Sequence, residues 1–186
     1  MIDYYFGVMG AGKTTVAVAL ACKAVKQGKK VFCNFPLKDT YSFDVSDLGV
    51  NLIEDALIII DEAGIEFNNR FFRSMSKEAI SFFKYSRQYR CDIVVLSQCH
   101  EDTDITIRRL ANRFFWVKKS IFGFTRVVSL YRHLYIDEKT QQLTYGFKPI
   151  SFFNNVFCKY YYRPKYYKYF NSWCPPVLPK KDFKKW

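Results

Sequence analysis

The stretch "GVMGAGKTT", residues 7–15, decides the fold of this chain of 186 residues. It satisfies the pattern Gly-x-x-x-x-Gly-Lys-Thr, follows a short strand predicted over residues 2–8, and opens a helix predicted over residues 13–27. Glycines in such a loop let backbone N–H groups close around phosphate oxygens, and the helix N-terminus adds a favourable dipole. The pattern predicts a phosphate-binding loop made of Gly7, Val8, Met9, Gly10, Ala11, Gly12, Lys13, Thr14 and Thr15.

The start of this helix and an acidic pair further along the chain predict how a nucleotide is held. We expect Lys13 to reach the phosphate oxygens and the Thr14 hydroxyl to ligate Mg²⁺, so that ATP and Mg²⁺ are the expected cofactors. "LIIIDEAG", residues 57–64, is an apolar strand that ends in carboxylates. We expect Asp61 to hold the magnesium shell at the carboxyl edge of the sheet and Glu62 to polarise a water molecule. This pair favours hydrolysis over transfer to a small substrate.

A further strand end carries an uncharged polar residue. "DIVVLSQ", residues 92–98, predicts a strand that Gln98 closes as Asp61 closes the previous one. An amide at that edge would hydrogen-bond the attacking water or the γ-phosphate and sense hydrolysis. The alternative is an ordinary strand-end residue, but beside the loop and the acidic pair a sensor role is favoured.

Arginines matter because ring-forming motors complete their sites with an arginine from a neighbouring subunit. Arg108 and Arg109 rank first, since they follow the Gln98 strand on the side of the sheet that carries the nucleotide; a solvated surface pair is an equal alternative. The other candidates are Arg70, Arg73 and Arg87. Lys77, Lys84 and Arg87 share one face of a predicted helix, where an ordinary charged surface is favoured over a phosphate-tracking stripe.

Strands and helices alternate through the first two thirds of the chain. Strands are predicted over residues 29–35, 56–61 and 92–98, and helices over residues 76–90, with Ser76 as N-cap and Arg87 and Arg90 in the last turn, and 103–113. From residue 113 the pattern becomes an antiparallel meander over residues 113–120, 125–136 and 142–150, with Gly123 in the first turn. The fold class is therefore α/β: a three-layer P-loop NTPase with a mainly parallel central sheet and an antiparallel extension near the C-terminus.

The formal net charge of +12 is concentrated toward the end of the chain. We expect an ATPase domain over residues 1–150 and a basic aromatic tail over residues 151–186, where "KYYYRPKYYKYF" interleaves rings with cations and "CPPVLP" favours an extended end. Three interpretations of the tail stay open: a contact with an anionic membrane surface, a contact with a single DNA strand, and a solvated segment.

Cysteine usage and hydropathy argue against a secreted disulfide-bonded protein and against a membrane-spanning one. The six cysteines form no C-x-x-C pair and no metal-ligand spacing, which favours a reduced protein of the cytosol or of a cytosol-facing surface. The glycine loop begins at the seventh residue, so we expect no signal peptide, and no apolar run approaches the ~20 residues of a membrane span.

Together, "GVMGAGKTT", "NFPL", "IIIDEAG" and "SRQYRCDIVVLSQ" followed by "DITIRRL" resemble the N-terminal domain of the zonular occludens toxin (Zot) family, the assembly ATPases of filamentous phages, over about residues 2–120. The resemblance implies a P-loop ATPase near the HerA and FtsK motors, in which the Gln98 strand lies between the loop strand and the Asp61 strand. By position, the resemblance assigns the binding of phosphate and magnesium to Lys13 and Thr14, and action on the metal and the water to Asp61 and Glu62. It matches Gln98 to the sensor glutamine of the family.

The resemblance also implies partners and a location. We expect an oligomer, in the form of a ring, that extrudes single-stranded phage DNA or its nucleoprotein with other phage assembly proteins, at the cytoplasmic face of the host inner membrane. Family members usually continue into a transmembrane helix, which does not appear before Trp186; a shortened form and attachment through a partner are both open. The rivals are another HerA/FtsK-like DNA packaging or partition translocase, a small-molecule or nucleoside kinase, and a toxin-like binding protein, which Lys13, Asp61 and Glu62 disfavour.

Overall fold

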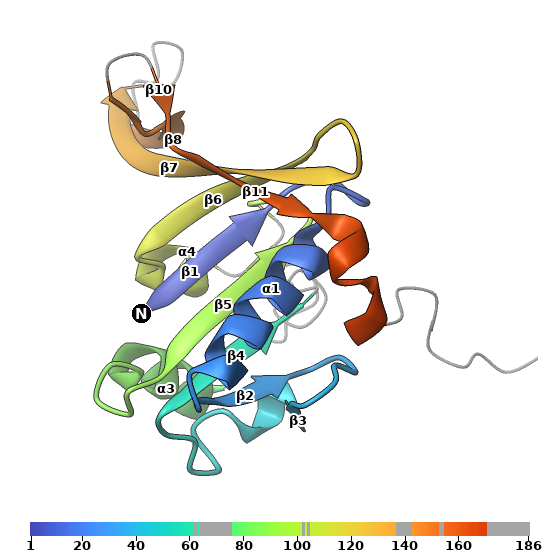
Figure 1. Cartoon of the computed structure of the whole chain (residues 1–186). Coiled ribbons are helices and arrows are strands. Elements are labelled where there is room, and N and C mark those ends of the chain that lie inside the picture. Colours follow the sequence, from blue (N-terminus) through green and yellow to red (C-terminus); the bar gives the residue numbers. More distant parts are fainter. Residues whose placement is uncertain are drawn as a thin grey trace, which may run out of the picture.

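One large sheet organises the chain in a computed structural model that describes residues 1–61, 63, 76–101, 103, 105–136, 143–152 and 155–170. Within these residues nine strands pair in the order β11-β7-β6-β1-β5-β4-β2-β3, with β8 joined to β7 (Figure 1). The strands of this sheet are β1 (Ile2–Phe6), β2 (Lys30–Cys33), β3 (Tyr41–Ser42), β4 (Ala56–Ile60), β5 (Asp92–Ser97), β6 (Arg113–Lys119), β7 (Phe124–Ile136), β8 (Leu143–Pro149) and β11 (Cys158–Tyr162).

The remaining described elements are short, apart from one helix. They are the helices α1 (Lys13–Lys26), α3 (Lys77–Tyr85) and α4 (Ile105–Leu110), the 3₁₀ turns η1 (Val45–Asp47), η3 (Arg163–Lys165) and η4 (Tyr167–Tyr169), and the small hairpin of β9 (Ser151–Phe152) and β10 (Asn155–Val156). None of the helices in the described ranges has the length and apolar character that a membrane crossing needs.

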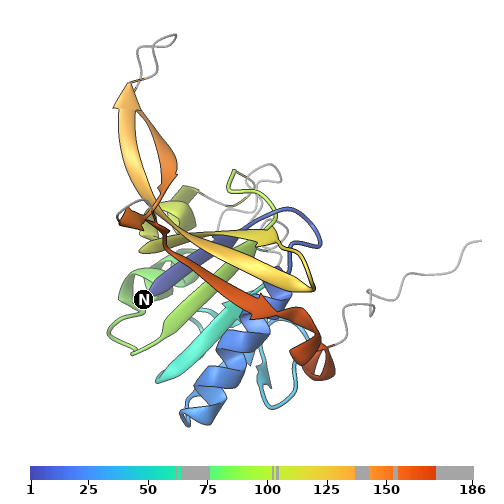
Figure 2. The same cartoon turned by 45° about the horizontal axis from the view of Figure 1, so that its top comes forward.

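The predicted fold class is confirmed. From β6 to β3 every neighbouring pair is parallel, whereas β7 pairs antiparallel with β6, β8 and β11. Figure 2 shows β7 and β8 extending beyond the rest of the sheet as a long hairpin. Gly123 has a φ of 75° in the turn between β6 and β7, as expected for a glycine there. The chain is therefore an α/β protein with an antiparallel extension.

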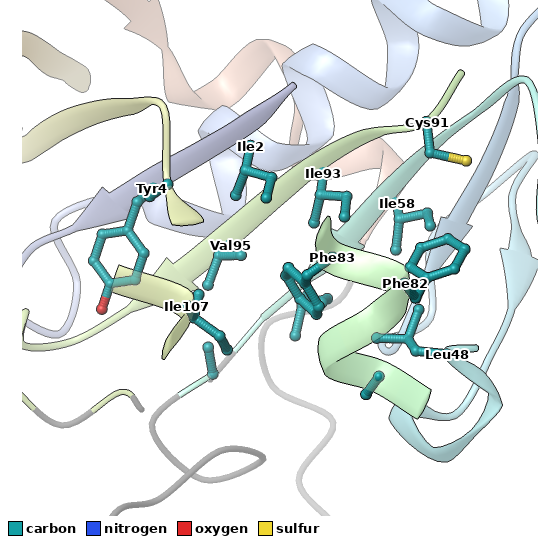
Figure 3. Close-up of a cluster of buried hydrophobic side chains, with 14 of the residues drawn as sticks. Ile2, Tyr4, Leu48, Ile58, Phe82, Phe83, Cys91, Ile93, Val95 and Ile107 are labelled. Atoms are coloured by element: carbon teal, nitrogen blue, oxygen red, sulfur yellow. The ribbon is translucent and has the colours of Figure 1, made fainter. Parts of the chain in front are cut away.

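Two cores cover the two faces of the sheet. Successive strand residues point to opposite faces, so Ile59 of β4 packs on the α1 side while Ile58 and Ile60 pack on the side of α3 and α4. Figure 3 shows the second cluster, in which Phe82 and Phe83 of α3 lie against the sheet residues Ile58 and Ile93. Because helices cover both faces, the central strand β4 is apolar and buried along its whole length.

Truncation of one ring in this cluster is expected to destabilise the fold. Phe83 is only 1% exposed, and Phe83→Ala removes a fully buried side chain and leaves a cavity, so we expect the free energy of unfolding to fall by about 3–5 kcal/mol. Urea denaturation followed by circular dichroism measures the change. Tyr85→Ala on the same helix is the matched control, because Tyr85 is half exposed. A loss for Phe83→Ala no larger than that of the control would contradict this packing.

The helix α3 is shorter than predicted. Ser76 is its N-cap and accepts a hydrogen bond from the amide of Ala79 (3.1 Å), as expected, but the helix ends at Tyr85 rather than at residue 90. Arg90 adopts a φ of 54° and makes a bidentate ion pair with Asp55. This turn leads the chain directly into β5, so the placement of Arg87 and Arg90 in the last helical turn is wrong, and Arg87 does not continue the helix face of Lys77 and Lys84.

Part of the segment assigned to the tail folds against the sheet. β11 pairs with β7 as an edge strand, and Tyr161 packs against the core on the α1 side. Beyond it, the Lys38 amide donates a hydrogen bond to the carbonyl of Tyr169 (3.3 Å). Residues 171–186, with "CPPVLP", lie outside the described residues, so the expectation of an extended end stays a prediction.

Candidate functional site

The predicted phosphate loop joins β1 to α1 at the carboxyl edge of the parallel strands. Gly10 and Gly12 have φ values of 74° and 98°, which residues with a side chain rarely adopt. Space is also limiting, because a Cβ at Gly7 would collide with the carbonyl oxygen of Val117 and one at Gly12 with Thr125 Oγ1. The glycines thus permit both the curvature of the loop and its close approach to β6 and β7.

Lys13 is buried and turns back over the loop. Its Nζ donates hydrogen bonds to the carbonyl oxygens of Gly7 (2.8 Å) and Val8 (3.3 Å). A primary ammonium held inside a loop of backbone amides is a ready partner for phosphate oxygens. This placement fits the predicted phosphate-binding role of Lys13.

Thr14 and Asp61 connect the two halves of the site. Thr14 Oγ1 donates a hydrogen bond to Asp61 Oδ2 (3.1 Å), although 46 residues separate them in the chain. Asn34 fixes Asp61 from the neighbouring strand, because its Oδ1 accepts from the Asp61 amide (2.8 Å) and its Nδ2 donates to the Asp61 carbonyl (3.0 Å). Hydroxyl and carboxylate oxygens are the ligands that Mg²⁺ prefers, so the predicted metal ligands Thr14 and Asp61 fit that ion.

Gln98 directly follows the end of β5. β5 pairs with β1 on one side and with β4 on the other, which confirms the strand order implied by the resemblance. The Gly7 amide donates to the carbonyl of Ser97 (3.2 Å), so the loop begins directly beside the end of β5. Gln98 is thus placed at the edge between the loop and Asp61, and its sensor role stays a prediction.

The family model described as zonular occludens toxin (Zot) matches residues 42–172. The chain belongs to the Zot family. No curated protein sequence gives a significant match.

Several solved structures share the fold of the chain. The N-terminal domain of zonular occludens toxin from Neisseria meningitidis superposes with a TM-score of 0.62 at 20% identity, over 91% of this chain and 98% of that one. The genome packaging NTPase B204 of Sulfolobus turreted icosahedral virus 2, in complex with ATP-gammaS, gives 0.51 at 10% identity, over 77% and 95%. The flagellar accessory protein FlaH of Methanocaldococcus jannaschii gives 0.50 at 12%, over 69% and 76%. At these identities the likeness establishes the fold, that of a P-loop NTPase.

Three of the predicted residues of the Zot chain are not placed by the structure. Glu62, Arg70 and Arg73 lie outside the described residues, so the water-activating role of Glu62 stays a prediction. The described neighbours of Glu62 are Asp61, at the site, and Ala63, which is fully buried.

Arg108 and Arg109 lie on α4, which packs on the face of the sheet opposite α1. Arg108 is near Tyr4 and His100, whereas Arg109 is exposed. Burial, with the nearby cations Arg108 and Arg132, lowers the pKa of His100 to about 4, so this histidine is neutral at physiological pH and does not repel Arg108. The contribution of either arginine to a neighbouring subunit of a Zot assembly stays a prediction.

Sequence reasoning missed two residues that shape this Zot site. Asn34 orients Asp61, and its signal was present in "NFPL", where an amide follows directly after an apolar strand. Thr125 donates a hydrogen bond to the carbonyl of Ala11 (3.1 Å) from the antiparallel extension. No local pattern marks Thr125, because the contact depends on how β7 lies against the loop.

Proposed function

We propose that the chain is an ATP-hydrolysing motor of filamentous phage morphogenesis, which drives extrusion of single-stranded DNA at the cytoplasmic face of the host inner membrane. The observation that carries the proposal is the contact of Thr14 with Asp61 across the end of β5, since it joins a phosphate loop to a carboxylate in an NTPase fold. Membership of the Zot family supports the use of that site in phage assembly.

The proposed chemistry begins with phosphate binding. Backbone amides of the loop and the Lys13 ammonium hold the β and γ phosphates of ATP. Thr14 and Asp61 would hold Mg²⁺, which when bound neutralises charge that develops on the phosphates. Asn34 keeps the Asp61 backbone in place, so that the carboxylate is oriented before the nucleotide arrives.

Hydrolysis in this proposal depends on the residues that follow β4 and β5. Glu62 accepts a proton from the attacking water, and Gln98 hydrogen-bonds that water or the γ-phosphate. The resulting phosphate state would be reported through Gln98 to β5, whose Ser97 carbonyl bonds the first residue of the loop. A ring of subunits with Arg108 or Arg109 supplied in trans would complete each site.

A double-stranded DNA packaging motor is the alternative with a specific observation in its favour, namely the likeness to a viral genome packaging NTPase. ATP turnover without DNA, with single-stranded DNA and with duplex DNA separates the two functions. We expect single-stranded DNA to raise turnover more than duplex DNA does. Turnover indifferent to both nucleic acids would refute the motor, and a preference for duplex would favour the packaging alternative.

The substitution Glu62→Gln tests the water-activating residue. We expect turnover to fall by roughly a hundredfold or more, because the amide cannot accept the proton, while nucleotide binding is retained. Binding of a fluorescent ATP analogue and release of phosphate measure the two effects separately. Glu54→Gln provides an exposed control with the same change of charge. Unchanged hydrolysis by Glu62→Gln would mean that another group activates the water.

A further inference from the structure

The antiparallel extension carries an exposed set of aromatic and cationic side chains on one face. Residues directly opposite on paired strands share a face, as do alternate residues along one strand. Lys118 of β6 is opposite Arg126 of β7, which is opposite Tyr160 of β11. On the same face, Trp116 precedes Lys118 in β6, and Phe124 lies opposite Tyr162. We call these six residues the aromatic–cationic face.

The aromatic rings of this face are accessible. Trp116 is 39% exposed, Tyr160 55% and Tyr162 46%, although all three lie in a sheet. Phe124 and Tyr162 contact each other at 5.1 Å between ring centroids, in a tilted arrangement. By contrast Tyr161, between Tyr160 and Tyr162, points to the other face and packs in the core on the α1 side. Along β11 the alternation therefore presents Tyr160 and Tyr162 to solvent and turns Tyr161 toward the core.

The cations of the face are interleaved with the rings. Lys118 Nζ lies 3.3 Å from the centroid of the Trp116 ring. Arg126 lies between Lys118 and Tyr160, and within the described part of the chain its Nε is buried without a hydrogen-bond partner. None of the six residues carries a negative charge. The face thus offers positive charge and stacking surface together.

We infer that the aromatic–cationic face binds single-stranded nucleic acid, with Tyr160 and Tyr162 stacking on bases and Lys118 and Arg126 contacting phosphates. Proteins bind single strands with this combination of ring platforms and cations, and the net charge of +12 suits a polyanion. The inference deepens the proposed function, because it names the surface on which the motor would hold its DNA.

The face is connected to the phosphate loop through the strands that bear it. Val117, between Trp116 and Lys118, places its carbonyl oxygen where a Cβ at Gly7 would collide with it. Thr125, between Phe124 and Arg126, donates to the Ala11 carbonyl (3.1 Å). Movement of the loop on nucleotide exchange would therefore act on the two strands that carry Lys118 and Arg126.

Binding of a fluorescein-labelled oligothymidylate of about 15 nucleotides, followed by anisotropy in the absence of ATP, tests the inference. We expect Tyr160→Ala to weaken binding about tenfold and Tyr160→Phe to retain it, because the ring and not the hydroxyl stacks on the base. Tyr167→Ala, at an exposed ring of η4 outside the face, is the control for aromatic truncation.

The salt dependence of binding tests the cations with a matched pair. Lys118→Ala should lower the slope of log K against log salt by about 0.7, as expected for one phosphate contact to a single strand. Lys119→Ala changes the next residue, which is also exposed but points to the opposite face, and should leave the slope unchanged. Equal effects of the two substitutions would overturn the inference.

Trp116 provides a local signal in the same chain. In a Trp173→Phe, Trp186→Phe background, oligothymidylate should change the emission of Trp116, because phosphate binding draws Lys118 Nζ from its ring. No change in emission at saturating oligonucleotide would contradict the assigned surface.

Two other outcomes would overturn it as well. In the first, Lys118→Ala and Tyr160→Ala abolish binding to phosphatidylglycerol vesicles while binding to oligothymidylate stays intact. In the second, the same substitutions reduce self-association in sedimentation while binding to oligothymidylate stays intact. Failure of the motor is distinguishable: if DNA does not stimulate turnover but the face variants lose oligonucleotide binding, the coupling is refuted and the binding surface stands.

Discussion

Replacing Lys13 by methionine is expected to lower ATP turnover by about a hundredfold or more, since removal of one donor that stabilises charge in the transition state has effects of that size. The Lys13 ammonium is held within the loop by the carbonyls of Gly7 and Val8, where it can exchange these partners for phosphate oxygens. Methionine keeps an unbranched side chain of similar length, so the loss reports on the charge and its donors. Phosphate release measures the effect.

The matched control is Lys23→Met, which makes the same change in α1 at an exposed position. We expect its turnover to be unchanged. Circular dichroism of both variants establishes that α1 is intact, because a collapsed helix would also abolish activity. If a folded Lys13→Met protein keeps a turnover within tenfold of that of the native chain, the ammonium does not act on the phosphates.

The parts of this molecule that were predictable from sequence are those set by local chemistry. The loop from Gly7 to Thr15 was recognisable because few other structures need glycines at this spacing before Lys-Thr. Asp61 and Gln98 were recognisable because each ends an apolar run, and parallel strands end at one edge. The structure adds the bond from Thr14 to Asp61, which makes these separate signals one site.

The parts that sequence reasoning could not supply depend on non-local pairing. The helix predicted to residue 90 ends at Tyr85, and in the turn that follows it Arg90 bonds Asp55, a residue far away in the chain. The segment "KYYYRPKYYKYF" permitted a membrane contact, a DNA contact or a solvated tail. The composition of the segment is the same whichever face a ring points to, whereas the pairing of β11 with β7 separates the exposed Tyr160 and Tyr162 from the half-buried Tyr161.

The second large expected effect is a loss of stability, which arises because the antiparallel extension lies close to the phosphate loop. Gly12→Ala is expected to lower the free energy of unfolding by about 3 kcal/mol, from two causes. The residue has a φ of 98°, which strains any side chain, and the added Cβ would collide with Thr125 Oγ1. Urea denaturation without nucleotide measures the loss.

Gly10→Ala separates these causes within the same loop. Gly10 has a φ of 74°, but nothing lies within 4 Å of an added Cβ. Only the backbone strain applies there, so we expect a loss of about 1 kcal/mol. Equal losses for Gly10→Ala and Gly12→Ala would mean that contact with Thr125 contributes nothing, and that the extension does not constrain the loop.

A double-mutant cycle then isolates the contact itself. Thr125→Ala alone removes the hydrogen bond to Ala11, which should cost about 1 kcal/mol. Combined with Gly12→Ala it also removes the Oγ1 and Cγ2 atoms that crowd the new Cβ, while the Thr125 Cβ stays at 3.1 Å. The double variant should therefore be less destabilised than the sum of the single variants, by about 1 kcal/mol or more. Strict additivity would show that β7 and the loop are energetically independent, and that DNA held on β7 has no direct route to the nucleotide.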